Sequence, residues 1–168
     1  MASTSSFDVT TGVDMMEVNN AVDQATKEIT QRYDFKGTKA SIELLAKEKK
    51  IVLAAPDDYK LKAMWDVLQS KMVRRQVPLK NLKPGKAEPA AGATVRQEIE
   101  MQDGLTADLA REIAKTIKDA KLKKVQAAIQ GDTVRVSSPD KDSLQEVMRL
   151  LRSQEFEVEL KFGNFRTN

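Results

Sequence analysis

The residues best suited to bind an anion form a lysine-rich run in the second half of the chain, Lys115, Lys118, Lys121, Lys123 and Lys124. Asp119 is the only acid inside this run, so the run would attract phosphate groups. Lysines near the carboxyl end of a helix also complement the helix dipole, which requires no ligand. Lys118, Lys121 and Lys123 are therefore candidate phosphate-binding residues, and the structural alternative stays open.

Arg135 is the best single candidate outside that run, because an extended segment would present it. It alternates with Val134 and Val136, which places its guanidinium on the polar face of a strand. A guanidinium binds phosphate through parallel hydrogen bonds and stacks on flat rings. A cross-strand ion pair with Glu157 or Glu159 would explain the same residue without a ligand.

Two short motifs mix polar, aromatic and flexible residues. In Asp34-Phe35-Lys36-Gly37, we expect Phe35 to pack inward, and Lys36 and the amide of Gly37 are candidate ligand contacts because glycine lets a ligand approach the backbone. A helix C-cap explains this motif equally well. Asn164-Phe165-Arg166 offers an amide, a ring and a guanidinium, which would suit a guanine base. In the alternative, Phe165 docks on the core and holds the chain terminus.

Histidine and cysteine are both absent from the 168 residues. This absence excludes Ser-His-Asp and Cys-His nucleophiles, imidazole acid-base catalysis, disulfides, and zinc sites built on thiolate or imidazole. No glycine-rich phosphate loop or pair of carboxylates stands out. We therefore expect a binding protein that is not an enzyme and that needs no cofactor or metal. The net charge of +3 permits an anionic partner without requiring one.

The N-terminal residues are polar, and no apolar run approaches the ~20 residues of a membrane span. We expect a cytoplasmic protein with no membrane partner.

The first half of the chain predicts the order strand, helix, strand, strand, helix, strand. Asp14 followed by Glu17 marks a helix start, and apolar residues recur every three or four positions as far as Tyr33, with Gly37 placed to end the helix. Trp65 falls on the apolar stripe of the second helix, so we assign it to the core. Alternation and turn signals predict strands at residues 7–10, 39–44, 51–55 and 77–82.

The second half repeats this order after a segment rich in Pro, Gly and Ala, residues 84–93, which is predicted to be a linker. The apolar stripes of its helices begin at Leu109 and Leu144. Gly131-Asp132 predicts a tight turn between the two middle strands. The predicted strands are residues 94–101, 125–130, 133–137 and 156–162.

These patterns predict an α+β protein made of two tandem ferredoxin-like, or RNP-like, βαββαβ domains, each an antiparallel sheet with its helices on one face. We place the domains at residues 1–83 and 94–168, joined by the linker at 84–93. In an alternative arrangement, the N-terminal strand joins the second sheet. RNP sheets read RNA by stacking bases on aromatic residues of the central strands. The polar faces of these strands carry no such residues, so RNP-type stacking is not expected.

Five short motifs resemble the bacterial YajQ family in content and order. They are Phe7-Asp8, Tyr33-Asp34-Phe35-Lys36-Gly37, residues 117–123, residues 130–136 and Asn164-Phe165-Arg166. The chain departs from the family pattern at Gly163, in an added lysine among Lys121 to Lys124, and in the alanine-rich linker. The resemblance implies tandem RNP-like domains and nucleotide binding. Some members of the family have been proposed as RNA binders or as cyclic-di-GMP receptors with regulatory effects.

The leading hypothesis is a nucleotide-binding protein that takes cyclic-di-GMP or another nucleotide as an effector. The bound effector would change the surface that the domains present to a regulatory protein partner. The alternative is RNA or DNA binding through phosphate contacts, which would weaken steeply with salt. An enzyme would need a strongly shifted pKa in a cleft, which a sequence alone does not reveal.

Overall fold

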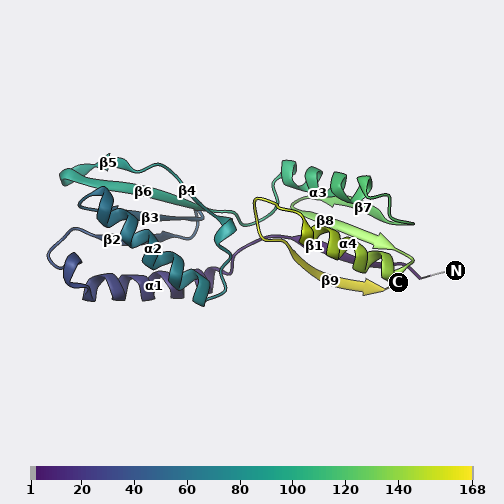
Figure 1. Cartoon of the computed structure of the whole chain (residues 1–168), viewed down its shortest axis with the longest axis horizontal. Helices are drawn as coiled ribbons and strands as arrows, with labels where there is room; N and C mark the ends of the chain where they lie inside the picture. Colours follow the sequence, from purple (N-terminus) through teal and green to yellow (C-terminus); the bar gives the residue numbers. More distant parts are fainter. Residues whose placement is uncertain (1–2, 168) are drawn as a thin grey trace. The chain divides into compact units, whose positions relative to one another are not determined.

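The computed structural model describes residues 3–167, and the chain divides into two compact units. The central unit consists of Val13–Asp103. The terminal unit combines the two end segments of the chain, up to Gly12 and from Gly104 onward. In Figure 1 the purple strand near the N-terminus accordingly lies beside green and yellow strands from the other end of the sequence.

The central unit is an antiparallel sheet with two long helices. Its strands lie in the order β2-β3-β6-β4, and β5 also pairs with β6. Trp65 packs against the core of this unit, as predicted. In chain order the unit contains α1 (Met15–Gln31), η1 (Tyr33–Phe35), β2 (Ser41–Leu45), β3 (Lys50–Ala55), α2 (Asp58–Arg74), η2 (Leu79–Asn81), β4 (Leu82–Pro84), β5 (Glu88–Ala90), η3 (Ala91–Ala93) and β6 (Thr94–Met101).

Helix α1 ends earlier than its apolar pattern indicated. Asp14 is the predicted N-cap, and its carboxylate accepts a hydrogen bond from the amide of Met16 at 3.0 Å. Arg32 leaves the helical region with φ −72° and ψ 134°, so the helix stops well before Gly37. Tyr33 therefore lies in η1 and is 91% exposed, and its assignment to the buried stripe was wrong.

Residues 84–93, predicted to be a linker, instead form part of the edge of the central sheet. β5 pairs with β6, and Glu88 lies opposite Arg96. The Gly85 amide also donates to the Glu98 carbonyl at 2.8 Å. The prolines of this segment are tolerated because an edge strand needs ladder hydrogen bonds on one side only.

The terminal unit is a second antiparallel sheet with two helices. Its strands lie in the order β7-β8-β1-β9, so β1 pairs with both β8 and β9, as in the alternative arrangement considered from the sequence. The unit contains β1 (Ser5–Thr10), α3 (Ala107–Asp119), β7 (Gln126–Gln130), β8 (Thr133–Ser138), α4 (Lys141–Ser153) and β9 (Lys161–Thr167).

Each unit has the βαββαβ arrangement, but its first strand comes from the opposite half of the chain. β1 takes the first-strand position in the terminal unit, and β6 takes it in the central unit. The expected domain limits of 1–83 and 94–168 therefore do not match the two units. Both strands alternate, so the pattern alone fits either sheet. Side-chain packing shows to which unit each strand belongs, because Phe7 of β1 lies in the core of the terminal unit and Ile99 of β6 lies in the core of the central unit.

The predicted fold class of two α+β RNP-like domains with antiparallel sheets is confirmed. The closing strand starts later than predicted, since β9 begins at Lys161. Phe156 and Val158 are nevertheless buried, although the segment that contains them is not a strand. Among residues 3–167, no helix is long and apolar enough to span a bilayer.

Candidate functional site

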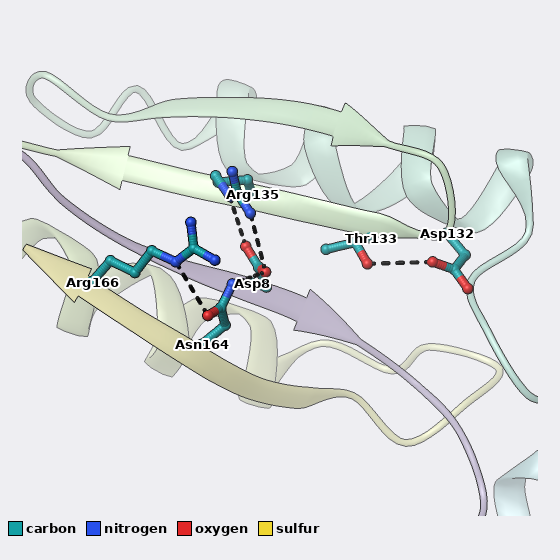
Figure 2. Close-up of polar contacts among 6 residues, drawn as sticks. All are labelled: Asp8, Asp132, Thr133, Arg135, Asn164 and Arg166. Carbon is teal, nitrogen blue, oxygen red and sulfur yellow. Dashed lines mark hydrogen bonds and ion pairs between the residues drawn. The ribbon is translucent and has the colours of Figure 1, made fainter.

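Four polar side chains meet on the open face of the terminal sheet (Figure 2). Arg135 on β8 donates through Nε to Asp8 Oδ1 at 3.0 Å and through a terminal nitrogen to Oδ2 at 3.5 Å. Asn164 on β9 donates to Asp8 Oδ2 at 2.7 Å, and Arg166 Nε donates to Asn164 Oδ1 at 3.2 Å. We call Asp8, Arg135, Asn164 and Arg166 the sheet-face cluster.

A β-bulge in β9 brings two members of the cluster to the open face. The pairing register of β1 with β9 shifts between Ser6 and Asp8. On the far side of this shift, Ser6 lies opposite Arg166. Asn164 accommodates the extra residue with a left-handed backbone, φ 53°. Without the bulge, strict alternation would turn Arg166 toward the core and Phe165 onto the open face.

Phe165 is directed away from the sheet-face cluster. Its ring centroid lies 6.0 Å from that of Phe7, which is fully buried, while Phe165 itself is 63% exposed. Phe165 thus contacts one core ring but stays largely exposed, so a chain end docked on the core remains a prediction. Among the residues that the structure describes, the open face at the cluster therefore offers charge and hydrogen bonds but no stacking ring.

Asp8 holds the cluster together. Its side chain is 13% exposed, and the hydrogen bond from Arg135 is the main cause that lowers the pKa of the Asp8 carboxyl. Burial opposes this shift, while Asn164 and the charge of Arg166 add to it. Arg135 bonds this carboxylate directly, and Arg166, which bonds to Asn164, acts on it only through its charge. The cluster of two arginines and one aspartate therefore has a net positive charge.

Sequence reasoning foresaw an ion pair for Arg135 but assigned the wrong partner. Arg135 pairs with Asp8, which lies directly opposite it in the β1–β8 register. Glu157 and Glu159 precede β9 and are not part of the sheet. Asp8 was missed as a site residue, although its place on an alternating strand was the available signal.

A second candidate site is a groove between α3 and β7, which we call the lysine groove. Its volume is about 620 Å³, and an apolar floor includes Ile117, Leu122 and Val125. Lys115, Lys118 and Lys121 also line it, together with Ala114, Gln126 and Ala127. The structure thus brings two of the three predicted lysines to one cavity. Lys123 is exposed and does not line the groove.

The lysines of the groove differ in their existing contacts. Lys115 forms an exposed ion pair with Asp119 at 3.2 Å. Within residues 3–167, the side chains of Lys118 and Lys121 have no hydrogen-bond or ion-pair partner. Two ammonium groups beside an apolar floor therefore stay available for an anion.

A smaller cavity of about 400 Å³ adjoins the lysine groove across the start of β7. Val125 and Gln126 line both cavities. The smaller one adds Lys124 and hydroxyl-bearing or compact residues, Thr4, Ser137, Ser138 and Pro139. The backbones of Lys121 and Lys124, one at each cavity, are left-handed with φ 51° and 58°. Such strained positions persist where the surrounding structure holds them, and they concentrate at binding sites.

Lys36 and Gly37 belong to the central unit and join neither of these sites. Both are exposed and follow η1. Gly37 has φ +74°, and no atom lies within 4 Å of the position that a Cβ would take. The backbone here is open to a ligand. Phe35, expected to pack inward, is buried.

The fold and these sites define a class of protein, a tandem RNP-like protein whose terminal unit carries a lysine-lined groove and a positive sheet face. The sequence profile of the family described as "Nucleotide-binding protein YajQ-like" matches residues 5–166. The chain belongs to this family, which confirms the resemblance recognised from its motifs.

Curated relatives cover nearly the whole chain. A nucleotide-binding protein of Koribacter versatilis (strain Ellin345) is 53% identical over 163 residues, 97% of this chain and 98% of the relative. A nucleotide-binding protein of Desulfitobacterium hafniense (strain DSM 10664 / DCB-2) is 53% identical over 166 residues, 99% of this chain and all of the relative. One from Geobacter sp. (strain M21) is 48% identical over 162 residues, 96% of this chain and 99% of the relative.

Proposed function

We propose that this protein binds a nucleotide in the lysine groove and acts as a binding protein rather than an enzyme. The observation that carries the proposal is one cavity of about 620 Å³ that combines an apolar floor with Lys118 and Lys121, which have no partner in the described part of the chain. This volume falls in the range of small-molecule sites, roughly 300–1,000 Å³. The names of the family and of its relatives point to the same ligand class.

The chemistry of the groove matches the parts of a nucleotide. A base would lie against Ile117, Leu122 and Val125, where burial of its apolar faces is favourable. The ammonium groups of Lys118 and Lys121 would meet the phosphate. The Gln126 amide has donors and an acceptor for a base edge.

The adjoining cavity supports a finer proposal, a cyclic dinucleotide such as cyclic-di-GMP. Such a ligand has two bases and two phosphates, and the two cavities share Val125 and Gln126 while each contributes at least one lysine. Binding across the start of β7 would alter the surface formed by α3 and β7. A regulatory protein partner that contacts this surface would then respond to the nucleotide.

Titration calorimetry with a nucleotide panel tests this proposal. The panel contains GMP, GTP, ATP, cyclic-di-GMP and cyclic-di-AMP. We expect micromolar binding of at least one member, reduced at least about tenfold in Lys118→Gln/Lys121→Gln because two charge contacts are lost. Lys62→Gln, an exposed lysine of α2 in the other unit, is the matched control and should bind as the native protein does. Absence of binding throughout the panel refutes the function, and unchanged binding by the double variant refutes the site.

A second candidate function is RNA or DNA binding through phosphates at the sheet-face cluster. The observation that favours it is the net positive charge left by Arg135 and Arg166 around the single carboxylate of Asp8. Each phosphate neutralised on a single strand contributes about −0.7 to the slope of log affinity against log salt. Arg135→Ala/Arg166→Ala should therefore weaken oligonucleotide binding and make that slope shallower. A slope that stays the same would argue against this face.

A further inference from the structure

The outer edge of β7 has no paired strand among the residues that the structure describes. β7 is the first strand in the order β7-β8-β1-β9, so it pairs with β8 on one side only. Four of its five residues are exposed. An unpaired strand edge is a template for another strand, and proteins usually protect such edges with charges, proline, bulges or a covering segment.

The other sheet edges formed by residues 3–167 have such protection. β9, at the opposite edge of the terminal sheet, contains a bulge and carries Lys161 and Arg166. β4 and β5 of the central sheet are three residues long and contain a proline each. β2 has Glu43 at its centre, which would oppose itself in a symmetric pair of strands. β7 reads Gln-Ala-Ala-Ile-Gln, with no charge, proline or register shift. Its edge is therefore the unprotected one.

The backbone of β7 directs alternate hydrogen-bonding groups away from the sheet. Gln130 and Thr133 pair with each other across a two-residue turn. Residues that flank such a turn exchange both hydrogen bonds, and the pattern alternates along an antiparallel pair. Gln130 and Ala128 therefore direct their backbone groups toward β8, while those of Ala127 and Ile129 point outward. These outward groups are the ones that a further strand would bond.

The sequence of β7 is complementary to itself. Two antiparallel copies related by a two-fold axis at Ala128 would place Ala127 of one copy opposite Ile129 of the other, a small side chain beside a large one. Gln126 would lie opposite Gln130, and their amides contain both donors and acceptors. The strand itself brings no like charges together in this arrangement, unlike β2.

The residues beyond the ends of β7 fit the same register. Lys124 lies two positions before the strand and Asp132 two positions after it, so opposite charges face each other at both ends of the symmetric pair. Ile129 is 45% exposed in the single chain, and pairing would cover it. Its partner in the second copy, Ala127, lines the lysine groove.

We propose that β7 is a self-association edge, through which two copies of this chain pair antiparallel about Ala128 and join their terminal sheets into one. The second copy then places its Ile129 beside Ala127 at the lysine groove, so each groove gains an apolar side chain from the other copy. The dimer needs no nucleotide, so it stands or fails separately from the function proposed above. An extended segment of a different protein could use the same edge only where the chain itself stays monomeric.

The register can be tested with single cysteines, because the chain has none of its own. Ala128→Cys puts two thiols across the axis at a non-hydrogen-bonded pair, where the Cα atoms are about 4.5 Å apart and a disulfide fits. Gln126→Cys is the matched control on the same strand, since its two copies lie four positions apart, about 14 Å. In a glutathione redox buffer, Ala128→Cys should form covalent dimers at least about tenfold faster on non-reducing gels. Equal rates would overturn the proposed register.

Sedimentation equilibrium of the full-length protein, from about 5 to 500 μM, tests the dimer without a crosslink. We expect reversible dimers with a Kd of roughly 10–100 μM, because a short strand pair is a small interface. Ile129→Pro removes an outward N–H and spares the pairing with β8, so it should weaken the dimer at least about tenfold. Ile129→Val keeps that N–H and should stay within about 2-fold.

Two results would overturn the proposal in this experiment. They are a native protein that stays monomeric over the whole range, as expected if the edge serves a different protein, and a proline variant that associates as strongly as the native chain. Thermal unfolding shows whether Ile129→Pro is folded. If it is not, the comparison of Ala128→Cys with Gln126→Cys decides, because both positions are exposed and tolerate the change.

Discussion

At the scale of single residues, the chemistry of the sheet face depends on Asp8. Its carboxylate accepts from Arg135 on one neighbouring strand and from Asn164 on the other. One acidic side chain therefore joins three strands and orients the guanidinium that a phosphate would meet. Charge-assisted hydrogen bonds of this kind are stronger than neutral ones.

Replacement of Asp8 by Asn should destabilise the protein by on the order of 1 kcal/mol, because charged hydrogen bonds are lost while the amide keeps the volume. The measurement is urea unfolding followed by circular dichroism. Asp66→Asn, an exposed acid of α2, is the matched control and should change stability by less than about 0.5 kcal/mol. Equal stability of the two variants would show that the cluster contributes nothing to folding.

The contribution of Asp8 should also depend on pH. The pKa of Asp8 is lowered from its ordinary value of 3.8 in the folded protein, so the unfolded chain binds the proton more readily. The stabilisation is complete well above pH 4 and is lost as the pH falls through the folded pKa. The stability difference between native protein and Asp8→Asn should therefore shrink from pH 7 to pH 3. A constant difference over this range would contradict the assigned cause.

At the scale of elements, the bulge in β9 decides which side chains reach the open face. Asn164 takes the left-handed backbone there, which a β-branched residue adopts poorly and glycine adopts freely. The same residue donates to Asp8, so it has a backbone role and a side-chain role.

Two substitutions separate the roles of Asn164. Asn164→Gly keeps the bulge and loses the hydrogen bond, and we expect a cost of about 1 kcal/mol or less. Asn164→Val adds the strain of a left-handed β-branched residue, for an expected further loss of about 1–2 kcal/mol. Thermal unfolding of both variants shows which of the two is more stable. If valine were as stable as glycine, the bulge would not require this conformation.

At the scale of the whole molecule, the two units depend on the exchange of first strands. Val13–Asp103 contains every strand of the central sheet, including β6. Residues 94–168, the domain expected from the sequence, lack β1 and with it Phe7 and Val9, which are fully buried in the terminal core. Loss of two buried side chains and a central strand exceeds the stability margin of a small domain.

Separate fragments test this organisation. A fragment of residues 13–103 should fold cooperatively, with dispersed amide resonances and a sharp thermal transition. A fragment of residues 94–168 should not fold by the same criteria. Residues 3–12 joined to residues 104–167 through a short Gly-Ser segment should restore a folded terminal unit. A cooperative transition in the 94–168 fragment would contradict the role assigned to β1.

The sequence by itself determined the fold class, most helix positions, the family and part of the candidate sites. Helical and alternating periodicities are local, so they identified Asp14 as a helix start. They also placed Lys118 and Lys121 on one helix, which was wrong, because α3 ends at Asp119 and Lys121 lies beyond it with a left-handed backbone, φ 51°. The same patterns misplaced Tyr33, because a helix end depends on backbone conformation as well as on apolar spacing. They also treated residues 84–93 as a linker, since pairing along a sheet edge leaves no strong local signal.

Only the tertiary structure decided the features that depend on distant partners. β1 and β6 each alternate in a way that fits either sheet, and long-range packing assigned them. Strand register chose Asp8 as the partner of Arg135, and a one-residue bulge chose Arg166 over Phe165 for the open face. The lysine groove likewise exists only where α3 meets β7, so its apolar floor could be seen only in three dimensions.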